Sequence, residues 1–92
     1  MNIQKNAPIG VFDSGLGGIS VLRELTALMP GEQFLYFGDD QNAPYGGRPE
    51  EEVLTLTRAG VNRLFEGGCK AVVLACNTAT AAAVVPLRAE MQ

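Results

Sequence analysis

Three short apolar segments, each followed by a turn and then by a helical pattern, constrain the fold of this 92-residue chain most strongly. They lie at residues 8–12, 33–37 and 70–76 and are continuous rather than alternating apolar runs. Continuous apolar strands are typical of parallel sheets that are covered on both faces. The sequence therefore predicts an α/β fold, a three-layer αβα domain with a parallel sheet and the order β-α-β-α-β-α.

Helical patterns fill the intervals between the strands. Residues 19–29 place apolar side chains at helical spacing, and Pro30-Gly31 ends the run. Pro49 and the acidic residues 50–52 predict a second helix start, because proline suits the first helical position and acids stabilise the positive end of the helix dipole. A third helix is expected to begin near Thr80. The side chains expected to face inward from the first two helices are Ile19, Leu22, Leu25, Met29, Val53, Leu56, Leu64 and Phe65.

This topology gathers the strand-to-helix loops at one edge of the sheet. Right-handed crossovers place every such loop at the carboxyl ends of the strands, where open parallel sheets bind ligands. The loops at 13–18, 39–48 and 76–78 all carry polar side chains. We expect a single domain over residues 1–92, with a polar tail at 1–7 and a site at this edge.

Composition excludes several classes of function. The net charge is −3, and the five arginines are scattered without a basic run, so no nucleic-acid footprint is present. No apolar run approaches the roughly 20 residues of a membrane span, and the first six residues are polar rather than the apolar core of a signal peptide. The chain is therefore expected to be cytoplasmic, with neither a nucleic acid nor a membrane as partner.

The two cysteines, Cys69 and Cys76, are expected to be reduced. If residues 70–75 form a strand, a rise of roughly 3.3 Å per residue separates them by about 23 Å, whereas a disulfide needs Cα atoms within about 7 Å. Cys69 then lies at the opposite edge of the sheet, where a structural role is expected. The chain contains no histidine and no close cluster of acids and thiols, so no metal site is predicted.

Cys76 is the principal candidate for chemistry. It could simply be a buried side chain that ends a strand, since free cysteine is among the most buried residue types. Its neighbours favour a site, because Asn77 and Thr78 are polar and the following helix offers unpaired N–H groups for a carboxylate or an oxyanion. A thiol at a helix start can also be held as a thiolate and aimed at a ligand.

Asp13 and Ser14 allow two interpretations. Either residue could cap the helix that follows by accepting its first backbone N–H groups. The glycines at 15, 17 and 18 favour instead a backbone that approaches a small ligand closely. A dinucleotide is not favoured, because the loop lacks the third glycine of G-x-G-x-x-G and Asp13 would repel a pyrophosphate. The loop at 43–48 could likewise be only a turn, since proline and glycine are standard turn residues.

Three motifs together resemble the amino-terminal half of bacterial glutamate racemases in order and spacing. They lie at residues 10–18 (GVFDSGLGG), 44–46 (PYG) and 75–80 (ACNTAT), and the resemblance spans residues 9–88. It implies a cofactor-independent isomerase that interconverts L- and D-glutamate, its small-molecule substrate, and supplies D-glutamate for peptidoglycan. The segment 40–42 departs from the Thr-Ala-Arg more often expected there, which affects local loop contacts.

The resemblance also implies roles for individual residues. Cys76 resembles one of two acid/base cysteines. Asp13 resembles a substrate contact that also aids proton transfer at the thiol. The other substrate-binding residues that the resemblance implies are Ser14, Tyr45, Gly46, Asn77 and Thr78.

The chemistry available in the chain agrees with this assignment. Removing the α-proton of an amino acid leaves a carbanion, which requires a base at one face, an acid at the other and donors on the carboxylate. Pyridoxal phosphate could stabilise the carbanion instead, but Lys5 lies in the polar tail and Lys70 at the wrong edge of the sheet for a Schiff base. No cofactor is therefore expected.

The resemblance implies a second cysteine in a second α/β half that this chain does not contain. We therefore expect a truncated racemase that cannot racemise alone, and that either lacks its carboxy-terminal half as a partner or self-associates through apolar surface. Two alternatives stay open. One is a non-enzymatic fragment or binding module that retains the fold, and the other is a superfamily racemase or isomerase for another amino or dicarboxylic acid.

Overall fold

The computed structural model describes residues 6–15 and 17–90, so Lys5 and most of the tail expected at 1–7 lie outside the described residues. One sheet contains three parallel strands in the order β2-β1-β3. The strands are β1 (Ile9–Asp13), β2 (Phe34–Gly38) and β3 (Ala71–Leu74), and the helices are α1 (Gly18–Leu28), α2 (Glu50–Glu66) and α3 (Asn77–Glu90). The predicted order of strands and helices is confirmed.

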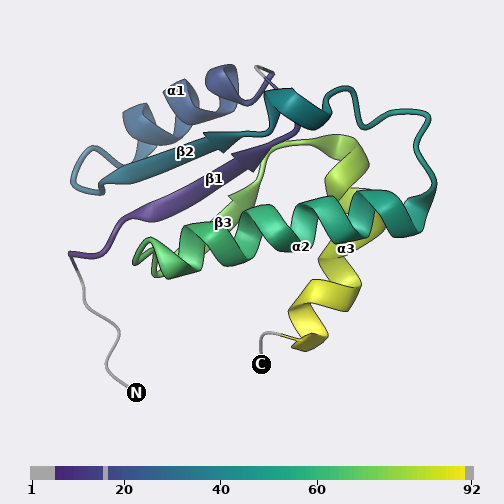
Figure 1. Ribbon diagram of the computed structural model, residues 1–92. Helices are drawn as coiled ribbons and strands as arrows, with labels where there is room; N and C mark the ends of the chain where they lie inside the picture. Colours follow the sequence, from purple (N-terminus) through teal and green to yellow (C-terminus); the bar gives the residue numbers. More distant parts are fainter. Residues whose placement is uncertain (1–5, 16, 91–92) are drawn as a thin grey trace.

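Helices lie on both faces of the sheet. Figure 1 shows α1 on one side and α2 with α3 on the other. The contacts of β1 agree with this arrangement, because successive side chains of a strand point to opposite faces of the sheet. A Cβ added at Gly60 of α2 would meet the Phe12 ring, whereas one added at Gly18 of α1 would meet Asp13. The three-layer αβα prediction is therefore confirmed.

The central strand β1 sets the position of the loops. Its register pairs Phe12 with Phe37 on one side and with Leu74 on the other. Two backbone bonds continue the ladder past the strand ends, from Asp39 N–H to Asp13 O at 2.9 Å and from Ala75 N–H to Phe12 O at 2.8 Å. The carboxyl ends of all three strands therefore meet at one edge, as predicted.

Two of the residues expected to face inward are exposed instead. Ile19 is 44% exposed, because Gly18 is the residue of α1 that turns toward the sheet, where it lies against Asp13 and Tyr36. Phe65 is 38% exposed, since it lies beside rather than within the buried stripe of α2. That stripe consists of Val53, Thr57, Gly60, Val61 and Leu64.

The boundaries around Cys76 also differ from the prediction. Strand β3 ends at Leu74 rather than at Cys76, and α3 begins at Asn77 rather than near Thr80. The reason is that the carbonyl of Cys76 already accepts the N–H of Thr80 at 2.9 Å, which is the first hydrogen bond of a helix. Asn77 and Thr78 therefore lie in the first turn of α3, directly after Cys76.

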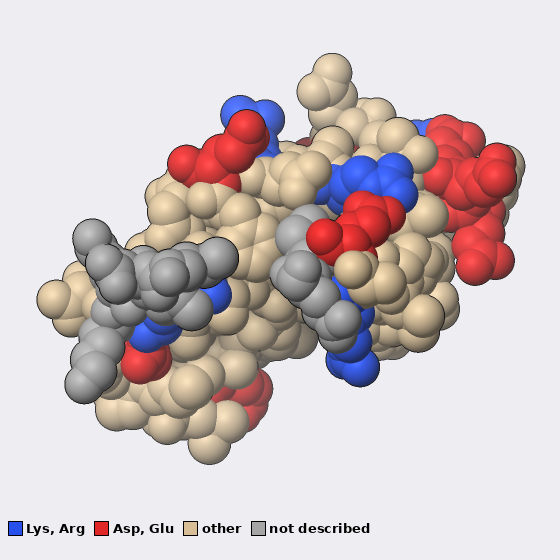
Figure 2. All heavy atoms as spheres, turned by 90° about the horizontal axis from the view of Figure 1, so that it is seen from below, with Lys and Arg blue, Asp and Glu red and all other residues tan. Residues whose placement is uncertain are grey.

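Charged side chains of both signs lie on the face drawn in Figure 2, and acidic ones gather at its right edge. On the face drawn in Figure 2, blue and red side chains are separated by uncharged ones or adjoin one another, without a continuous basic patch. Among the ion pairs, Arg58 of α2 contacts Glu90 of α3 at 2.8 Å, and Lys70 contacts Glu32 at 2.6 Å. Within the described residues, no helix combines the length and the apolar character that crossing a bilayer would require.

Candidate active site

Cys76 and Ser14 meet at the carboxyl edge of the sheet. The thiol of Cys76 donates to Ser14 Oγ at 3.3 Å, which joins the loop after β1 to the loop after β3. The backbone N–H of Ala79 donates to Cys76 Sγ at 3.5 Å. The sulfur therefore has a hydroxyl on one side and a helix N–H on the other.

The position of Cys76 is that of a helix cap. It directly precedes α3, and its sulfur accepts from the third residue of the helix, where serine or aspartate oxygens accept in ordinary caps. The side chain is half-buried and packs against the core cluster that contains Phe12 and Tyr45. A group held at this end of a helix lies in the positive field of the helix dipole, which stabilises negative charge.

Asp13 does cap α1, so the capping interpretation is correct for this residue. Its side chain is 4% exposed, and Oδ2 accepts the N–H of Gly18 at 2.7 Å and that of Gly15 at 3.2 Å. Ser14 behaves differently, since its hydroxyl meets Cys76. The structure therefore shows a capping role for Asp13 and a contact of Ser14 with the thiol, and ligand binding by either residue stays a prediction.

Tyr36 of β2 is bonded to the same loop. Its hydroxyl donates to Gly15 O at 2.7 Å and approaches Asp13 Oδ2 at 3.4 Å. Burial raises the pKa of the Tyr36 hydroxyl, and the neighbouring Asp13 charge raises it further. Sequence reasoning placed Tyr36 in a strand without a role. The available signal was register, because Tyr36 pairs with Val11 and so faces the same side of the sheet as Asp13.

Tyr45 is buried rather than open to a ligand. Its side chain is 1% exposed, its ring lies 6.2 Å from that of Phe12, and its hydroxyl donates to Asp39 Oδ2 at 2.6 Å. Burial raises the pKa of Tyr45, and the hydrogen bond and charge of Asp39 add to the shift. The hydroxyl is therefore occupied by Asp39, and the Tyr45 carbonyl accepts the N–H of Arg48 at 3.1 Å. The backbone N–H groups of Tyr45 and Gly46 are the groups left for a ligand.

The loop that carries Tyr45 is tied down at several points. Asn42 donates through Nδ2 to both carboxylate oxygens of Asp39 at 3.1 Å. Arg48 donates to Asn42 O at 2.8 Å and to Pro44 O at 3.3 Å, and it also pairs with Glu52. The segment is therefore more than a simple turn, although its tip at Gly46 is exposed.

The remaining predicted site residues lie in the first turn of α3. Asn77 is exposed and Thr78 is half-buried. At the opposite edge, Cys69 is buried, and this burial raises the pKa of its thiol. Both cysteines are free thiols, and the described residues contain no group of three or more potential metal ligands.

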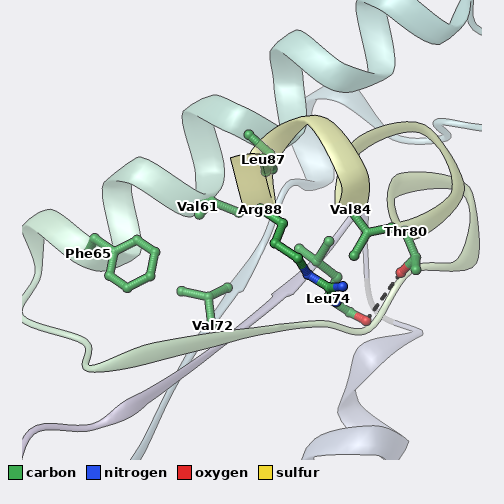
Figure 3. Close-up of a pocket in the computed structure, with 8 residues that line it drawn as sticks. All are labelled: Val61, Phe65, Val72, Leu74, Thr80, Val84, Leu87 and Arg88. Carbon is green, nitrogen blue, oxygen red and sulfur yellow. Dashed lines mark hydrogen bonds between the residues drawn. The ribbon is translucent and has the colours of Figure 1, made fainter. Parts of the chain in front are cut away.

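A separate apolar hollow lies away from the thiol. It has a volume of about 370 Å³ between α2, β3 and α3. Figure 3 shows its lining side chains: Val61, Phe65, Val72, Leu74, Thr80, Val84, Leu87 and Arg88. The hydroxyl of Thr80 approaches Leu74 O at 3.4 Å. Cys76 is not among the residues that line this hollow.

The arrangement around Cys76 can perform proton transfer at one face of a ligand. It offers one thiol, one hydroxyl and the N–H groups of a helix start, which suit a carboxylate. Removing and returning a proton on opposite faces of a carbon requires a second acid/base group. Cys69 cannot be that group, since it is buried beside Gly10 in β1.

Comparisons with known proteins agree with the resemblance seen in the motifs. The chain is 55% identical to the glutamate racemase of Clostridium botulinum over 87 residues, which is 95% of this chain and 34% of that protein. It superposes with a TM-score of 0.91 on a crystal structure of glutamate racemase from Thermus thermophilus, at 48% identity over 95% of this chain and 34% of the other.

A second similar structure was determined with glutamate bound. It is glutamate racemase from Francisella tularensis in complex with D-glutamate, with a TM-score of 0.88 and 35% identity over 94% of this chain and 33% of that one. No protein-family model matches the chain. The chain therefore spans about one third of the length of the racemases that it resembles, and the predicted resemblance is confirmed over that third.

Proposed function

We propose that this chain, a homologue of about one third of a glutamate racemase, forms one half of the active site of a cofactor-independent enzyme that interconverts L- and D-glutamate. The observation that carries the proposal is the position of Cys76. Its sulfur lies between Ser14 Oγ and the Ala79 N–H, at the edge of the sheet where ligands bind.

In the proposed reaction, Cys76 exchanges the α-proton at one face of glutamate. As thiolate it removes the proton, and as thiol it returns one to the carbanion. The hydroxyl of Ser14 can both accept and donate, so it can follow the sulfur through both protonation states. Asn77 and Thr78, together with the N–H groups of the first turn of α3, bind the substrate carboxylate and amino group.

Asp13, Tyr45 and Gly46 complete the proposed substrate contacts. The carboxylate of Asp13 aids proton transfer through the loop that it fixes, because Ser14 follows it directly and contacts the thiol. Tyr45 and Gly46 contribute backbone groups, since the Tyr45 hydroxyl is bonded to Asp39. A loop with such internal bonds holds its backbone donors in place before the ligand arrives, which reduces the cost of ordering them.

The whole proposed enzyme needs more polypeptide than this chain. The relatives are about three times as long, and the described residues supply one thiol at this edge. We propose that the 92 residues form one amino-terminal domain, that the opposing acid/base group comes from the remainder of a longer protein, and that this chain alone does not racemise glutamate. The enzyme would act in the cytoplasm and supply D-glutamate for peptidoglycan.

Protection of a thiol by ligand tests the proposed site. The chain is treated with iodoacetamide with and without D-glutamate, and modification of each cysteine is followed by mass spectrometry. D-glutamate should slow the modification of Cys76, and glutarate, which has the same carbon chain without the amino group, should protect less. Equal rates with and without D-glutamate would contradict the proposed site and leave a chain that retains only the fold.

The identity of the acid is a separate question. A racemase or isomerase of the same superfamily could act on aspartate or another dicarboxylic acid. Turnover of glutamate and aspartate by a full-length protein that carries this segment, measured side by side, distinguishes these alternatives. Preference for glutamate supports the proposal, and preference for aspartate overturns it.

A further inference from the structure

We infer that Tyr36 is a positioning residue for Cys76: its hydroxyl fixes the Gly15 carbonyl, and this bond holds Ser14 at hydrogen-bond distance from the thiol. The bond lengths along this path are 2.7 Å from Tyr36 Oη to Gly15 O and 3.3 Å from Cys76 Sγ to Ser14 Oγ. The path from Tyr36 to the sulfur runs through Gly15 and Ser14, so Tyr36 acts through the loop.

The space around Tyr36 is built for this contact. A Cβ at Gly38 would lie 2.4 Å from Gly15 O and 3.2 Å from the Tyr36 hydroxyl oxygen. A Cβ at Gly18 would lie 3.1 Å from Cε1 of the same ring. Two glycines, one in the strand and one at the helix start, therefore leave room for the ring and for the loop carbonyl.

A second bond prevents the loop from turning away. Asp13 Oδ2 accepts the N–H groups of Gly15 and Gly18 and lies 3.4 Å from the Tyr36 hydroxyl. Gly15 is therefore held on both sides, through its N–H by Asp13 and through its carbonyl by Tyr36. Because burial and the Asp13 charge keep the Tyr36 hydroxyl protonated, it remains a donor over the physiological pH range.

The consequence concerns the reactivity of the thiol. When Cys76 ionises, the Ser14 hydroxyl can rotate and donate to the sulfur, provided that the loop holds it in place. Loss of the Tyr36 bond should release the loop and weaken this donation. The expected cost is that of one hydrogen bond, which corresponds to an about 2- to 12-fold slower alkylation of Cys76 near neutral pH.

The test compares Tyr36→Phe with the unchanged chain by following iodoacetamide modification of each cysteine across pH. In Tyr36→Phe, the pH at which Cys76 reacts at half its maximal rate should rise, and Cys69 should stay protected because it is buried. Thr26→Val is the matched control, since it removes a hydroxyl that bonds Arg23 O on the exposed side of α1. It should leave the Cys76 profile unchanged.

Two results would overturn the inference. One is an unchanged Cys76 profile in Tyr36→Phe. The other is simultaneous exposure of Cys69, which would mean that the hydroxyl only stabilises the fold. The double variant Ser14→Ala/Tyr36→Phe provides an independent check. If Tyr36 acts through Ser14, its Cys76 alkylation profile should match that of Ser14→Ala alone. Additive shifts of the two substitutions would contradict that path.

Any effect of Tyr36 on racemisation rests on the proposed function. Its effect on the alkylation of Cys76 does not. If Tyr36→Phe shifts the profile while D-glutamate fails to protect Cys76, the positioning role stands and the proposed function fails. If D-glutamate protects Cys76 and the profile does not move, the proposed function stands and the inference fails.

Discussion

The hydroxyl of Tyr45 donates to Asp39 Oδ2 at 2.6 Å, and this bond fixes the loop between β2 and α2 to the end of its own strand. The carboxylate of Asp39 also accepts two hydrogen bonds from Asn42. The backbone N–H of Asp39 donates to Asp13 O. Asp39 thus connects the loop that carries Tyr45 to the loop that carries Ser14. The half-buried Asp39 therefore helps to hold two sides of the candidate site.

Alkaline pH should reveal the burial of Tyr45. Its pKa in the folded chain is raised above the ordinary value of 10.0, so the folded state favours the protonated form. The resulting stability is fully present below about pH 10 and is lost as the pH rises further. Urea unfolding at several pH values from about 8 to 11 should show a steeper loss of stability in the unchanged chain than in Tyr45→Phe. Parallel curves would contradict the account.

At pH 8 the same variant should be less stable than the unchanged chain. Tyr45→Phe removes the shorter of the two hydrogen bonds to Asp39 Oδ2 and leaves the one from Asn42. A hydrogen bond to a charged group contributes about 1.5–3 kcal/mol. The midpoint of urea unfolding measures this difference.

Gly60 should not tolerate a side chain. A Cβ at this position would lie 2.1 Å from Cε1 of the Phe12 ring, which is itself fully buried between α2 and the sheet. Gly60→Ala should therefore destabilise the fold by about 1–3 kcal/mol, the usual cost of overpacking, despite alanine's better helix propensity. Gly31→Ala is the control, because nothing lies within 4 Å of its added Cβ. A stability change of similar size in both variants would contradict the packing argument.

Thr57 should be replaceable by valine. Its side chain is fully buried in α2, and its hydroxyl oxygen has no hydrogen-bond partner among the described residues. Thr57→Val keeps the shape and removes an unsatisfied polar atom, so stability should stay equal or rise by about 1–3 kcal/mol. Thr55→Val is a matched control, since Thr55 donates to Glu51 O on the exposed face. A clear loss of stability in Thr57→Val would indicate a partner for this hydroxyl.

The apolar hollow beside β3 should promote association of the isolated chain. Phe65 lines this hollow and is 38% exposed, and β3 pairs only with β1 among the described strands. Exposed strand edges and apolar patches both favour contacts between chains. Sedimentation should show concentration-dependent association that Phe65→Ser reduces. Leu28→Ser, which removes a 74% exposed leucine from α1, should not reduce it. A monomer at all concentrations would contradict this prediction.

Much of the architecture could be predicted from local sequence patterns. Apolar runs identified the three strands, and Pro49 with the acidic residues 50–52 identified the start of α2. The start of α3 was missed by three residues, because Asn77 and Thr78 were read as loop residues although Cys76 provides the cap. A cysteine cap carries no strong propensity signal, in contrast to serine or aspartate.

The candidate site was only partly predictable for a different reason. Cys76 and Ser14 could be brought together because parallel topology places both loops at one edge. The hydrogen bonds of Tyr36 and Asp39 and the burial of Tyr45 could not be predicted, because periodicity does not encode bonds between loops and strands. The exposure of Ile19 and Phe65 could not be predicted either. Helical spacing identifies the apolar face of a helix, but it does not show which edge of that face the sheet covers.

A chimeric enzyme tests whether Cys76 exchanges the α-proton of glutamate. The matching third of the Thermus thermophilus glutamate racemase, which superposes on this chain with a TM-score of 0.91, is replaced by these 92 residues. Circular dichroism of the sample over time then reports interconversion of L- and D-glutamate. The chimera should racemise glutamate, and the chimera carrying Cys76→Ala should not. A folded chimera that does not racemise, or one that keeps full activity without the Cys76 thiol, would contradict it.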